Sequence, residues 1–457
     1  MLKHCQNSFA MGILGLACAS WLYVALTGCK PSEKAGSGGR SASTGSQQSS
    51  HSSGTGAELP ADDPQAVDSL RSLNAQIETN AAGRVVRVDF TTATQCNDRV
   101  LSMLKGLPSL ESLVAANWPD VSDAGLDHLL TLQKLKIIDV GGTAITDAGV
   151  AKLATLPSLE DVDLQRTSIT DEAIRSLSQL PQLRRLRVVR CNLSDRALEY
   201  LKDKVALELL DLTDVAGSAG GITDAGLAHL SGLVKLRSLR LWGPGITDAG
   251  MVHLEPLQNL VALAMADVYV SDSGMASIGK LKNLQELRIY QAYLGNNGLA
   301  HLKDLTRLER INVRANAIGD DGIAALGDIP SLRVIDLSET VVGDAGMQHL
   351  ARLPKLEDLN LLRTRVTDQG LPAIAQIKTL KRLNLDNVQI TDKGLEILGT
   401  MTNLEWLHLG RNDISDEGLK HLHNLKLKTI FLSNCPKVTA AGIESLRAAI
   451  PGIEVVQ

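Results

Sequence analysis

A carboxylate recurs at a fixed place in a six-residue phrase, ITDAGL or a close variant, through most of the chain. The column contains Asp123, Asp147, Asp171, Asp195, Asp224, Asp248, Asp272, Asp320, Asp344, Asp368, Asp392 and Asp416. A row of carboxylates suggests a calcium ladder, but one carboxylate per turn falls short of the six or more oxygens that calcium takes. Each Asp follows Ser, Thr or Gly where a helix should open, and there side-chain oxygens cap free amides and negative charge suits the helix dipole. We therefore expect a structural column.

A histidine occupies the eighth position of several of these phrases. The members are His128, His229, His253, His301, His349 and His421. Zinc binding is the chemistry that such a stripe suggests, yet only His229 and His253 lie in adjacent phrases. Helices of neighbouring units lie roughly 8–10 Å apart, whereas zinc needs three or four ligands about 2 Å from the metal. The pattern favours half-buried imidazoles beside leucines, and we expect no metal site.

A third column, two residues before the phrase, holds small polar residues and cysteine. It contains Thr143, Thr167, Cys191, Asn316, Thr340, Thr364 and Asn412, with Cys435 in the corresponding part of the last unit. Side chains of this kind bond to turn backbone, so Cys191 should be a buried ladder member rather than a nucleophile. The region beyond the N-terminal segment has no Ser-His-Asp phrase, phosphate loop or CxxC motif. The sequence therefore predicts neither an enzyme nor a cofactor.

The few aromatic residues are unevenly spread. The chain has 3 Phe, 4 Trp and 5 Tyr, and four of these rings lie between Trp242 and Tyr293. Large side chains are expected on two strands that flank a strand of alanines, which would form a shallow groove about 9–10 Å across. Trp, Tyr and Arg dominate binding hot spots; the alternative is a chance grouping of exposed rings. The candidate ligand-binding residues are Arg240, Trp242, Ala264, Ala266, Tyr269, Arg288, Tyr290 and Tyr293.

Two weaker candidate sites lie elsewhere. Trp406, His408 and Phe431 form a secondary patch near the C-terminal end, which could equally shield the last strands. A basic set consists of Arg166, Arg185, Arg187 and Arg190, and it is opposed by Asp161, Asp163, Asp211 and Asp214. Because both signs are interspersed there, we interpret this set as a charged, solvated surface.

The elements that position these residues follow from a strict repeat. Fourteen copies of the phrase begin between Val121 and Val438; twelve of the 13 intervals are 24 residues and one, with an insert at about 215–221, is 29. Within one unit the apolar period changes from that of a short strand to that of a helix, as at Leu159, Val162 and Leu164, then Ile174, Leu177 and Leu180. Each unit is therefore predicted to be strand, turn and helix. One unit cannot bury its own apolar stripe, so the units must stack.

This spacing resembles the L-x-x-L-x-L-x-x-N/T/C-x-I pattern of leucine-rich repeats over nearly all of residues 85–457. The ITDxGL helix starts are similar to the cysteine-containing repeats of eukaryotic F-box proteins and to repeats of exported bacterial proteins. The resemblance implies an α/β solenoid, a horseshoe of about 15 units with a concave parallel sheet and outer helices. No F-box precedes the repeats, which argues against a substrate receptor of a ubiquitin ligase.

The N-terminus has the layout of an export signal. Residues 1–28 contain one Lys and then small and apolar residues. Leu26-Thr27-Gly28-Cys29 resembles the lipobox of bacterial lipoproteins, which implies cleavage before Cys29 and attachment of palmitate or similar acyl chains to it. The alternative is an uncleaved anchor helix. We expect a signal peptide at 1–28, a Ser/Gly-rich tether at 29–60, a capping helix and strand at 61–95, and leucine-rich repeats at 96–457.

The net charge and the N-terminal segment limit the classes of function that the sequence predicts. The net charge of -5, with interspersed signs, excludes a broad nucleic-acid surface or a polybasic membrane surface. We predict a membrane-tethered module that binds a protein, peptide or glycan on its concave face and contacts the membrane only through its lipid. It should be exported to the bacterial cell envelope, and Lys30 after Cys29 favours the outer membrane. The alternatives are a structural envelope component without a specific ligand and, least favoured, a metal-dependent enzyme.

Overall fold

The computed structural model describes residues 59–215 and 220–457. The predicted signal peptide, Cys29, nearly all of the predicted tether and the middle of the predicted insert lie outside the described residues. Residues 59–457 form one compact unit.

Most strands are three residues long and recur once per repeat. They are β1 (Gln76–Thr79), β2 (Val85–Asp89), β3 (Ser112–Val114), β4 (Ile137–Asp139), β5 (Asp161–Asp163), β6 (Arg185–Arg187), β7 (Leu209–Asp211), β8 (Ser238–Trp242), β9 (Ala262–Ala266), β10 (Glu286–Tyr290), β11 (Arg310–Asn312), β12 (Val334–Asp336), β13 (Asp358–Asn360), β14 (Arg382–Asn384), β15 (Trp406–His408), β16 (Thr429–Phe431) and β17 (Glu454–Val456).

Short helices alternate with these strands. They are α2 (Pro64–Ser72), α3 (Asp98–Leu101), α4 (Asp123–Leu126), α5 (Asp147–Leu153), α6 (Asp171–Leu177), α7 (Asp195–Leu201), α8 (Asp224–Leu227), α9 (Asp248–Met251), α10 (Met275–Ile278), α11 (Asn296–Ala300), α12 (Asp320–Leu326), α13 (Asp344–Leu350), α14 (Leu371–Ile374), α15 (Asp392–Leu398), α16 (Asp416–Leu419) and α17 (Ala440–Ala449). Short 3-10 helices are η1 (Ser102–Gly106), η2 (Ala228–Leu230), η3 (Val252–Leu254) and η4 (Lys420–Leu422).

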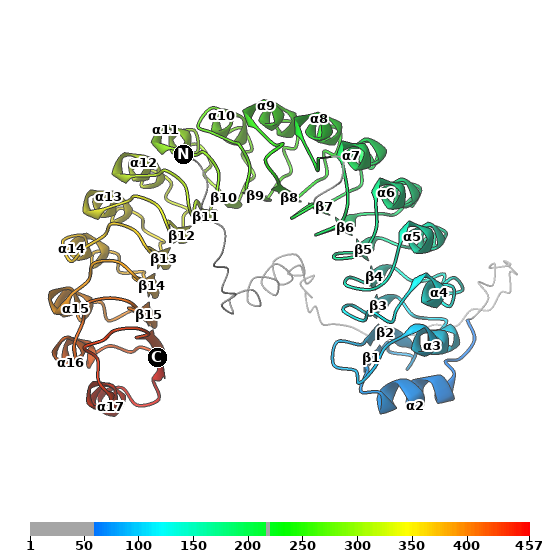
Figure 1. The fold of residues 1–457 in the computed structure, drawn as a ribbon, viewed down its shortest axis with the longest axis horizontal. Coiled ribbons are helices and arrows are strands. Elements are labelled where there is room, and N and C mark those ends of the chain that lie inside the picture. Colours follow the sequence, from blue (N-terminus) through cyan, green and yellow to red (C-terminus); the bar gives the residue numbers. More distant parts are fainter. Residues whose placement is uncertain (1–58, 216–219) are drawn as a thin grey trace, which may run out of the picture. The chain divides into compact units, whose positions relative to one another are not determined.

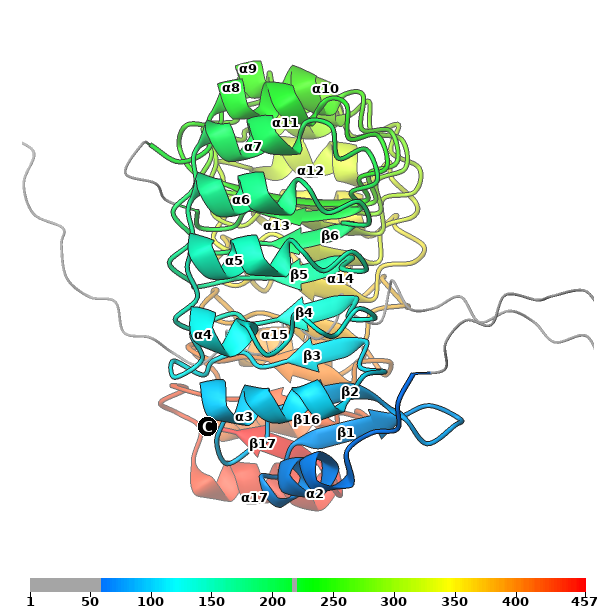
Figure 2. The same cartoon turned by 90° about the vertical axis from the view of Figure 1, so that its right-hand side faces the viewer.

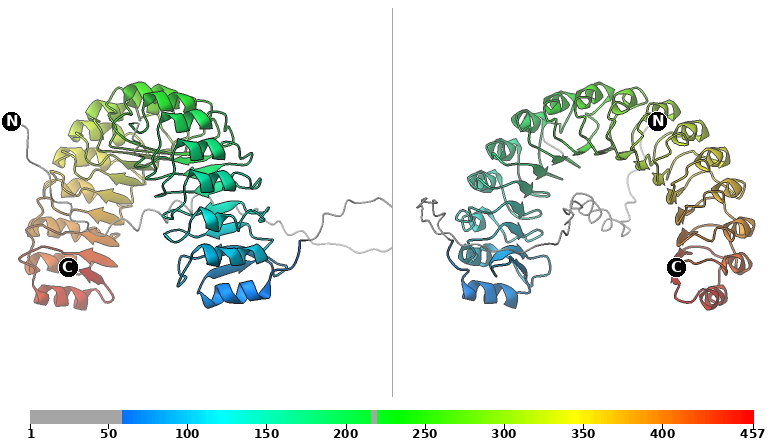
Figure 3. Two further views of the ribbon diagram at one scale, coloured as in Figure 1. Left: turned by 45° about the vertical axis from the view of Figure 1, so that its right-hand side comes forward. Right: turned by 180° about the vertical axis from the view of Figure 1, so that it is seen from behind.

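The predicted fold class is confirmed. Within the described residues the strands form one 17-stranded sheet, in which each strand pairs with the next along the chain. All these pairs are parallel except β1 with β2. The strands line the inner side of an arc and the helices its outer side (Figure 1). The same arc is seen obliquely and from behind in Figure 3, and Figure 2 shows the units stacked as layers. The structure is therefore an open horseshoe.

The core is one continuous apolar column between sheet and helices. In the unit used above to define the pattern, Leu159, Val162 and Leu164 from the strand side are completely buried. Ile174 and Leu177 from the helix side meet them and are also completely buried. Because each unit covers the apolar faces of its neighbours, the solenoid is stabilised by stacking rather than by the helices, which are too short to be stable alone.

The Asp column of the phrase links consecutive units. In most units the Ser or Thr before the Asp is the helix N-cap: the Thr146 hydroxyl, for example, accepts the N–H of Ala148. Asp123 of the preceding unit accepts the N–H of Thr146 at 2.9 Å and its O–H at 2.6 Å. The same two bonds occur in Asp98–Ser122, Asp147–Thr170, Asp171–Ser194, Asp195–Thr223, Asp224–Thr247, Asp248–Ser271, Asp344–Thr367, Asp368–Thr391, Asp392–Ser415 and Asp416–Thr439. The column is structural as expected, but its role is to join units rather than to cap its own helix.

The carboxylate bonds between consecutive units, which we call the Asp ladder, also explain the glycine of the phrase. A Cβ added at Gly149 would lie 2.1 Å from Oδ1 of Asp123, because the ladder carboxylate occupies the space beside this glycine. Ala173 and Ala197 occupy the corresponding position in two other units, and both are buried. The close approach therefore favours glycine and tolerates alanine where the units adjust.

The Thr/Asn/Cys column bonds inward, as predicted. The Thr167 hydroxyl donates to the Leu164 carbonyl at 2.6 Å, and the Cys191 thiol donates to the same carbonyl at 3.2 Å. Asn316 donates to the carbonyls of Ile289 and Val313 at 2.8 and 2.9 Å. These buried side chains satisfy turn backbone that faces the core.

The N-terminal end is closed by a hairpin. Asp63 is the N-cap of α2, and Asp62 accepts the N–H of Val85 at 2.6 Å, which fastens the helix start to β2. Strand β1 was not predicted from the sequence. Its four residues, QIET, contain one apolar side chain and are mostly exposed, so they give no alternating signal.

Candidate functional site

Three adjacent strands bring the predicted ligand-binding residues together. Strands β8, β9 and β10 have five residues each, compared with three in most other units. Their register aligns Arg240, Ala264 and Arg288 in one row. A second row consists of Trp242, Ala266 and Tyr290. We call these six residues, with Tyr269 and Tyr293 at the adjoining turns, the central patch.

The indole of Trp242 is held in place. Its Nε1–H donates to Oδ2 of Asp267 at 2.8 Å. Asp267 has a φ of 51°, in the left-handed region that Asp tolerates better than most residues. Sequence reasoning missed Asp267; the signal for it is its place at the turn directly after the strand of alanines. The bond leaves the faces of the indole, rather than its N–H, for a ligand.

Both arginines of the central patch have carboxylate partners. Arg240 is 3.2 Å from Oδ2 of Asp211. Arg288 is 2.5 Å from Oε1 of Glu286, on its own strand. Each guanidinium group is therefore held beside the aromatic rings by an ion pair, and the carboxylate of that pair balances its charge.

The tyrosines differ in exposure. Tyr290 is half-buried, and this burial raises its pKa above the usual value, so its hydroxyl stays protonated at neutral pH. Tyr269 and Tyr293 are 53% and 66% exposed and pack edge to face, with ring centroids 5.1 Å apart. Exposed tyrosines that hold each other in place suit a binding surface, because little side-chain entropy is lost on contact.

The alanine row is only partly open. Ala262 and Ala264 are half-buried, but Ala266 is 4% exposed. The groove floor predicted at Ala264 and Ala266 is therefore accessible at Ala264 and buried at Ala266.

The secondary patch is a packed ring cluster. The rings of His408 and Phe431 stack 4.8 Å apart with an interplanar angle of 2°, and Trp406 lies 5.2 Å from Phe431. The Arg382 guanidinium lies 4.5 Å from the centre of the Trp406 ring and pairs with Asp358 at 3.1 Å. Arg382 lies opposite Trp406 in the register of β14 and β15. The same strand position one unit earlier in the sequence would therefore have identified Arg382 as a neighbour of Trp406.

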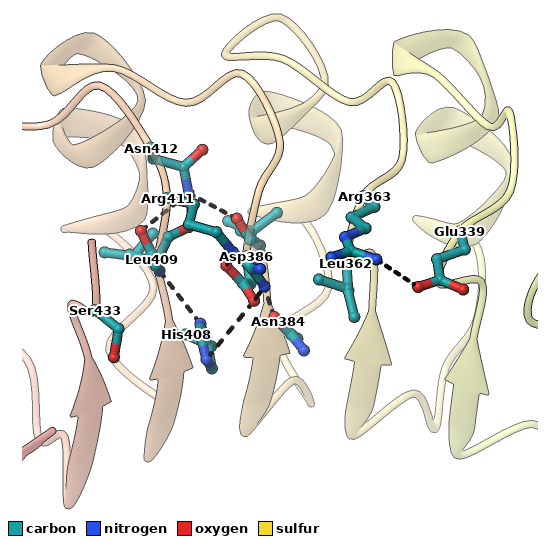
Figure 4. Close-up of polar contacts among 12 residues, drawn as sticks. Glu339, Leu362, Arg363, Asn384, Asp386, His408, Leu409, Arg411, Asn412 and Ser433 are labelled. Carbon is teal, nitrogen blue, oxygen red and sulfur yellow. Dashed lines mark hydrogen bonds and ion pairs between the residues drawn. The ribbon is translucent and has the colours of Figure 1, made fainter. Parts of the chain in front are cut away.

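An ion pair between the exposed Arg411 and the buried Asp386 lies beside His408 of this cluster (Figure 4). Asp386 is 6% exposed and accepts two bonds from Arg411, one of them at 2.9 Å. Nε2 of His408 lies 4.0 Å from the same carboxylate, and Nδ1 accepts the N–H of Gly410. Burial lowers the pKa of His408 below its usual value. A neutral, stacked imidazole bound to backbone fits the structural interpretation of this patch.

The basic set is a charge network, as interpreted from the sequence. Asp161 pairs with Arg185 at 2.7 Å and with Arg187 at 2.8 Å. Arg190 pairs with Asp214 at 2.6 Å. Arg166 donates to the side chain of Asn117 at 2.7 Å. All four arginines therefore form ion pairs or hydrogen bonds with other side chains of the solenoid.

Two neighbouring carboxylates carry unusual pKa values. Asp139 and Asp163 occupy matched positions on β4 and β5, and each accepts a backbone N–H two residues further on. Burial, followed by the charge of Asp139, raises the pKa of Asp163 to about 7. Burial also raises the pKa of Asp139. Sequence reasoning placed Asp163 in the charge network and did not single out this pair.

The remaining groups of possible reactivity are the potential metal ligands and the thiols of the described residues. Within residues 59–215 and 220–457, no group of three or more His, Cys, Asp or Glu side chains is placed to hold a metal ion. Cys96, Cys191 and Cys435 are free and buried, and burial raises the pKa of Cys96 to about 12. No helix of the same described part is long and apolar enough to cross a membrane.

The chain belongs to the leucine-rich repeat family. A family profile described as a leucine-rich repeat region matches residues 194–427, just over half of the chain, and a profile for a single leucine-rich repeat matches residues 131–154. This fold is commonly a protein-interaction or ligand-binding module. No curated protein matches the sequence.

Solved structures support the same fold. An internalin of Listeria monocytogenes is 23% identical, with a TM-score of 0.55, over 82% of this chain and 98% of its own. A leucine-rich repeat protein of Leptospira interrogans is 17% identical, with a TM-score of 0.54, over 88% of this chain and 100% of its own. TLR13, solved in complex with ssRNA13, is 19% identical, with a TM-score of 0.50, over 78% and 57%. At these identities the likeness concerns the fold alone.

Proposed function

We propose that this protein is an exported, lipid-anchored binding module whose central patch holds a protein, peptide or glycan partner. The observation that carries the proposal is the row Trp242, Ala266 and Tyr290 on the concave face, with an exposed Tyr269–Tyr293 pair at its edge. The chain has only 3 Phe, 4 Trp and 5 Tyr residues, and four of these rings lie between Trp242 and Tyr293.

The central patch is also preorganised. Trp242 is fixed by Asp267, Arg240 by Asp211, and Tyr269 by Tyr293. Side chains that are already ordered lose little entropy when a partner binds, so more of the contact energy contributes to affinity. The rings of the secondary patch are also ordered by contacts with one another, but they are half-buried, whereas Tyr269 and Tyr293 are exposed.

The anchoring part of the proposal rests on the sequence. Leu26-Thr27-Gly28-Cys29 supports lipidation at Cys29, and the Ser/Gly-rich stretch that follows supports a flexible tether. About 30 residues of flexible coil reach roughly 30 Å. Such a tether would let the horseshoe meet a partner away from the membrane surface, in the bacterial envelope and, from Lys30, at the outer membrane.

Quantitative capture tests the proposal. The full-length chain and its Trp242→Ala/Tyr290→Ala variant are immobilised and exposed to envelope extract and to secreted proteins and glycans of the source cells. We expect one species to be retained by the native chain and lost by the double variant. Trp406→Ala is the matched control, since it removes a half-buried ring of the secondary patch and should retain the species. Equal capture by all three chains would instead favour a structural envelope component.

A further inference from the structure

Most of the large apolar side chains that remain exposed lie on two edges of the solenoid. Within the described residues they are Val205, Val234, Val252, Tyr269, Tyr293 and Val341. Val205 and Val234 precede strands β7 and β8, whereas both tyrosines and Val341 follow strands β9, β10 and β12. Because these strands are parallel, the segments that enter them lie at one edge of the sheet and the segments that leave them lie at the other. Single exposed apolar residues are ordinary, but neighbouring ones mark interaction surfaces.

At the edge where the chain leaves the strands, three consecutive units differ from the rest. The residue before the phrase is apolar there, and the second residue of the phrase is glycine, whereas every other copy of the phrase has Ser or Thr at this second place. We call these residues the glycine edge: Tyr293, Ala317 and Val341 with Gly295, Gly319 and Gly343. The three apolar side chains are exposed. An edge that lacks three hydroxyls and carries apolar side chains in the same units is suited to a contact from which water is excluded.

The glycines also leave two carboxylate oxygens of the Asp ladder without a hydroxyl donor. Oδ1 of Asp272 accepts the N–H of Gly295, and Oδ1 of Asp320 accepts the N–H of Gly343, each at 2.7 Å. In most other units the second oxygen accepts a Ser or Thr hydroxyl, which glycine lacks. Oδ2 of Asp272 and Oδ2 of Asp320 lie 3.1 and 3.4 Å from the position of a Cβ added to the respective glycine, so each oxygen borders the space that a side chain would fill. The glycine edge therefore combines exposed apolar side chains with negative charge that the ladder does not use.

The opposite edge has apolar side chains beside positive charge. Val205 and Val234 occupy the same position in consecutive units, four residues before β7 and β8, and both are exposed. Lys202 and Lys235 are close to them in the sequence, are exposed and form no ion pair with any other described residue. We call these four residues the lysine edge. Its apolar side chains and its charge are complementary to those of the glycine edge.

From these two edges we infer that copies of this chain associate side by side, with the glycine edge of one copy against the lysine edge of the next. The valines of the lysine edge cover the apolar side chains of the glycine edge, and its two lysines approach the free oxygens of Asp272 and Asp320. Apolar surface then leaves water on both copies, while the opposite charges set the orientation. The same carboxylates disfavour an anionic membrane as the occupant. Because the two edges lie on opposite sides of one copy, the contact is head-to-tail and continues as an open row.

Sedimentation of the full-length chain over a range of concentrations tests the inference. The chain is kept in a density-matched non-ionic detergent, so that only the protein mass is measured. In 50 mM salt we expect the mass to rise with concentration beyond that of two chains, because each assembly keeps one open edge of each kind. In 500 mM salt the association should weaken about threefold or more, since exposed charges are screened.

Variants of single edges locate the contact. Val341→Arg places a positive charge on the glycine edge, and Val205→Asn/Val234→Asn removes the apolar cover from the lysine edge. Each variant alone should remain a single chain at concentrations at which the native chain assembles. An equimolar mixture of the two should form a dimer and stop there, because each variant supplies the edge that the other lacks. Val252→Arg is the matched control and should assemble like the native chain, since Val252 is 50% exposed, compared with 43% for Val341, but lies in η3.

Three results would each overturn the inference: native protein that remains a single chain at every concentration, variants that assemble like the native chain, or a mixture that remains single chains. Circular dichroism and the thermal midpoint check that the variants are folded, and Ala317→Arg replaces Val341→Arg if that variant is not. Tyr293 belongs to both the glycine edge and the central patch and is left unchanged. Both variants should therefore still capture the partner of the central patch, so that failure of this inference is distinguishable from failure of the proposed function.

Discussion

Trp242 and Tyr290 flank one residue, Ala266, from the two strands on either side of it. This arrangement depends on the length of β8, β9 and β10, because Trp242, Ala266 and Tyr290 are the last residues of their strands. In most other units the strand has three residues and ends two residues before the corresponding position. The central patch is thus a local extension of the repeat rather than a property of every unit.

Asp267 should act on binding through the indole of Trp242. Asp267→Ala removes the acceptor of the indole N–H and places alanine at a φ of 51°, so we expect about a threefold to tenfold loss of partner capture. Asp267→Asn keeps an acceptor oxygen and tolerates this φ, and it should restore most of the capture. Near-UV circular dichroism, which reports a fixed indole, should follow the same order. Equal capture by all three chains would show that the orientation of Trp242 is irrelevant.

The Asp ladder should contribute to stability one unit at a time. Asp224→Ala removes the acceptor of two bonds from Thr247, at 2.8 and 2.6 Å. We expect a loss of about 1–3 kcal/mol, typical for hydrogen bonds to a charged group. Asp321→Ala is the matched control, since Asp321 is an exposed acid in the first turn of α12. Denaturant unfolding should separate the two variants, and similar losses would contradict a ladder role.

The pKa of Asp163 predicts a dependence of stability on pH. Because the folded-state pKa of about 7 lies above the usual value of 3.8, the folded protein binds the proton more tightly than the unfolded chain. This contribution to stability is present at acidic pH and lost as pH rises through about 7. Asp163→Asn keeps an oxygen for the N–H of Gln165 and removes the buried charge, so it should raise the thermal midpoint at pH 8. It should also flatten the fall of the midpoint between pH 3.8 and about 7, the two pKa values of the unfolded and folded states.

Asp211 occupies the same strand position as Asp163, two units further along the chain, and serves as its control. Asp211 makes the equivalent bond to the N–H of Thr213 but also pairs with Arg240. Asp211→Asn should therefore lower the thermal midpoint at pH 8, opposite in sign to Asp163→Asn. If both substitutions shift the midpoint in the same direction, the account of Asp163 is wrong.

Lipidation at Cys29 is tested by labelling. Cells that express the full chain are grown with radiolabelled palmitate, and we expect the label in the native chain and none in Cys29→Ala. Equal labelling of both chains, or of neither, would remove the support for a lipid anchor.

The regular part of this fold was predictable because it depends on local repetition. The 24-residue interval and the apolar positions such as Leu159 and Ile174 determine strand, turn and helix in every unit, and burial follows from stacking. The alignment of Trp242 with Tyr290 was predictable for the same reason, since equal intervals give equal register. The short β1 was not, because QIET has no repeat partner.

The contacts between columns were harder to predict. The partner of each ladder Asp lies in the next unit, so the phrase alone suggested a cap on its own helix. Asp267 and the burial of Ala266 depend on where side chains turn after the strand ends, which the period does not specify. The raised pKa of Asp163 depends on the neighbouring strand as well. These features become visible only when adjacent units are placed side by side.

The most direct test of the central claim is site-specific photo-crosslinking in cells. Tyr269 at the edge of the central patch is 53% exposed, and Val252 on the outer helices is 50% exposed, so the two sites are equally accessible to a photoreactive phenylalanine analogue. The account predicts one discrete adduct from position 269, lost when Trp242→Ala is added, and none from position 252. Adducts that are the same from both positions, or that survive Trp242→Ala, would contradict a binding site at the central patch.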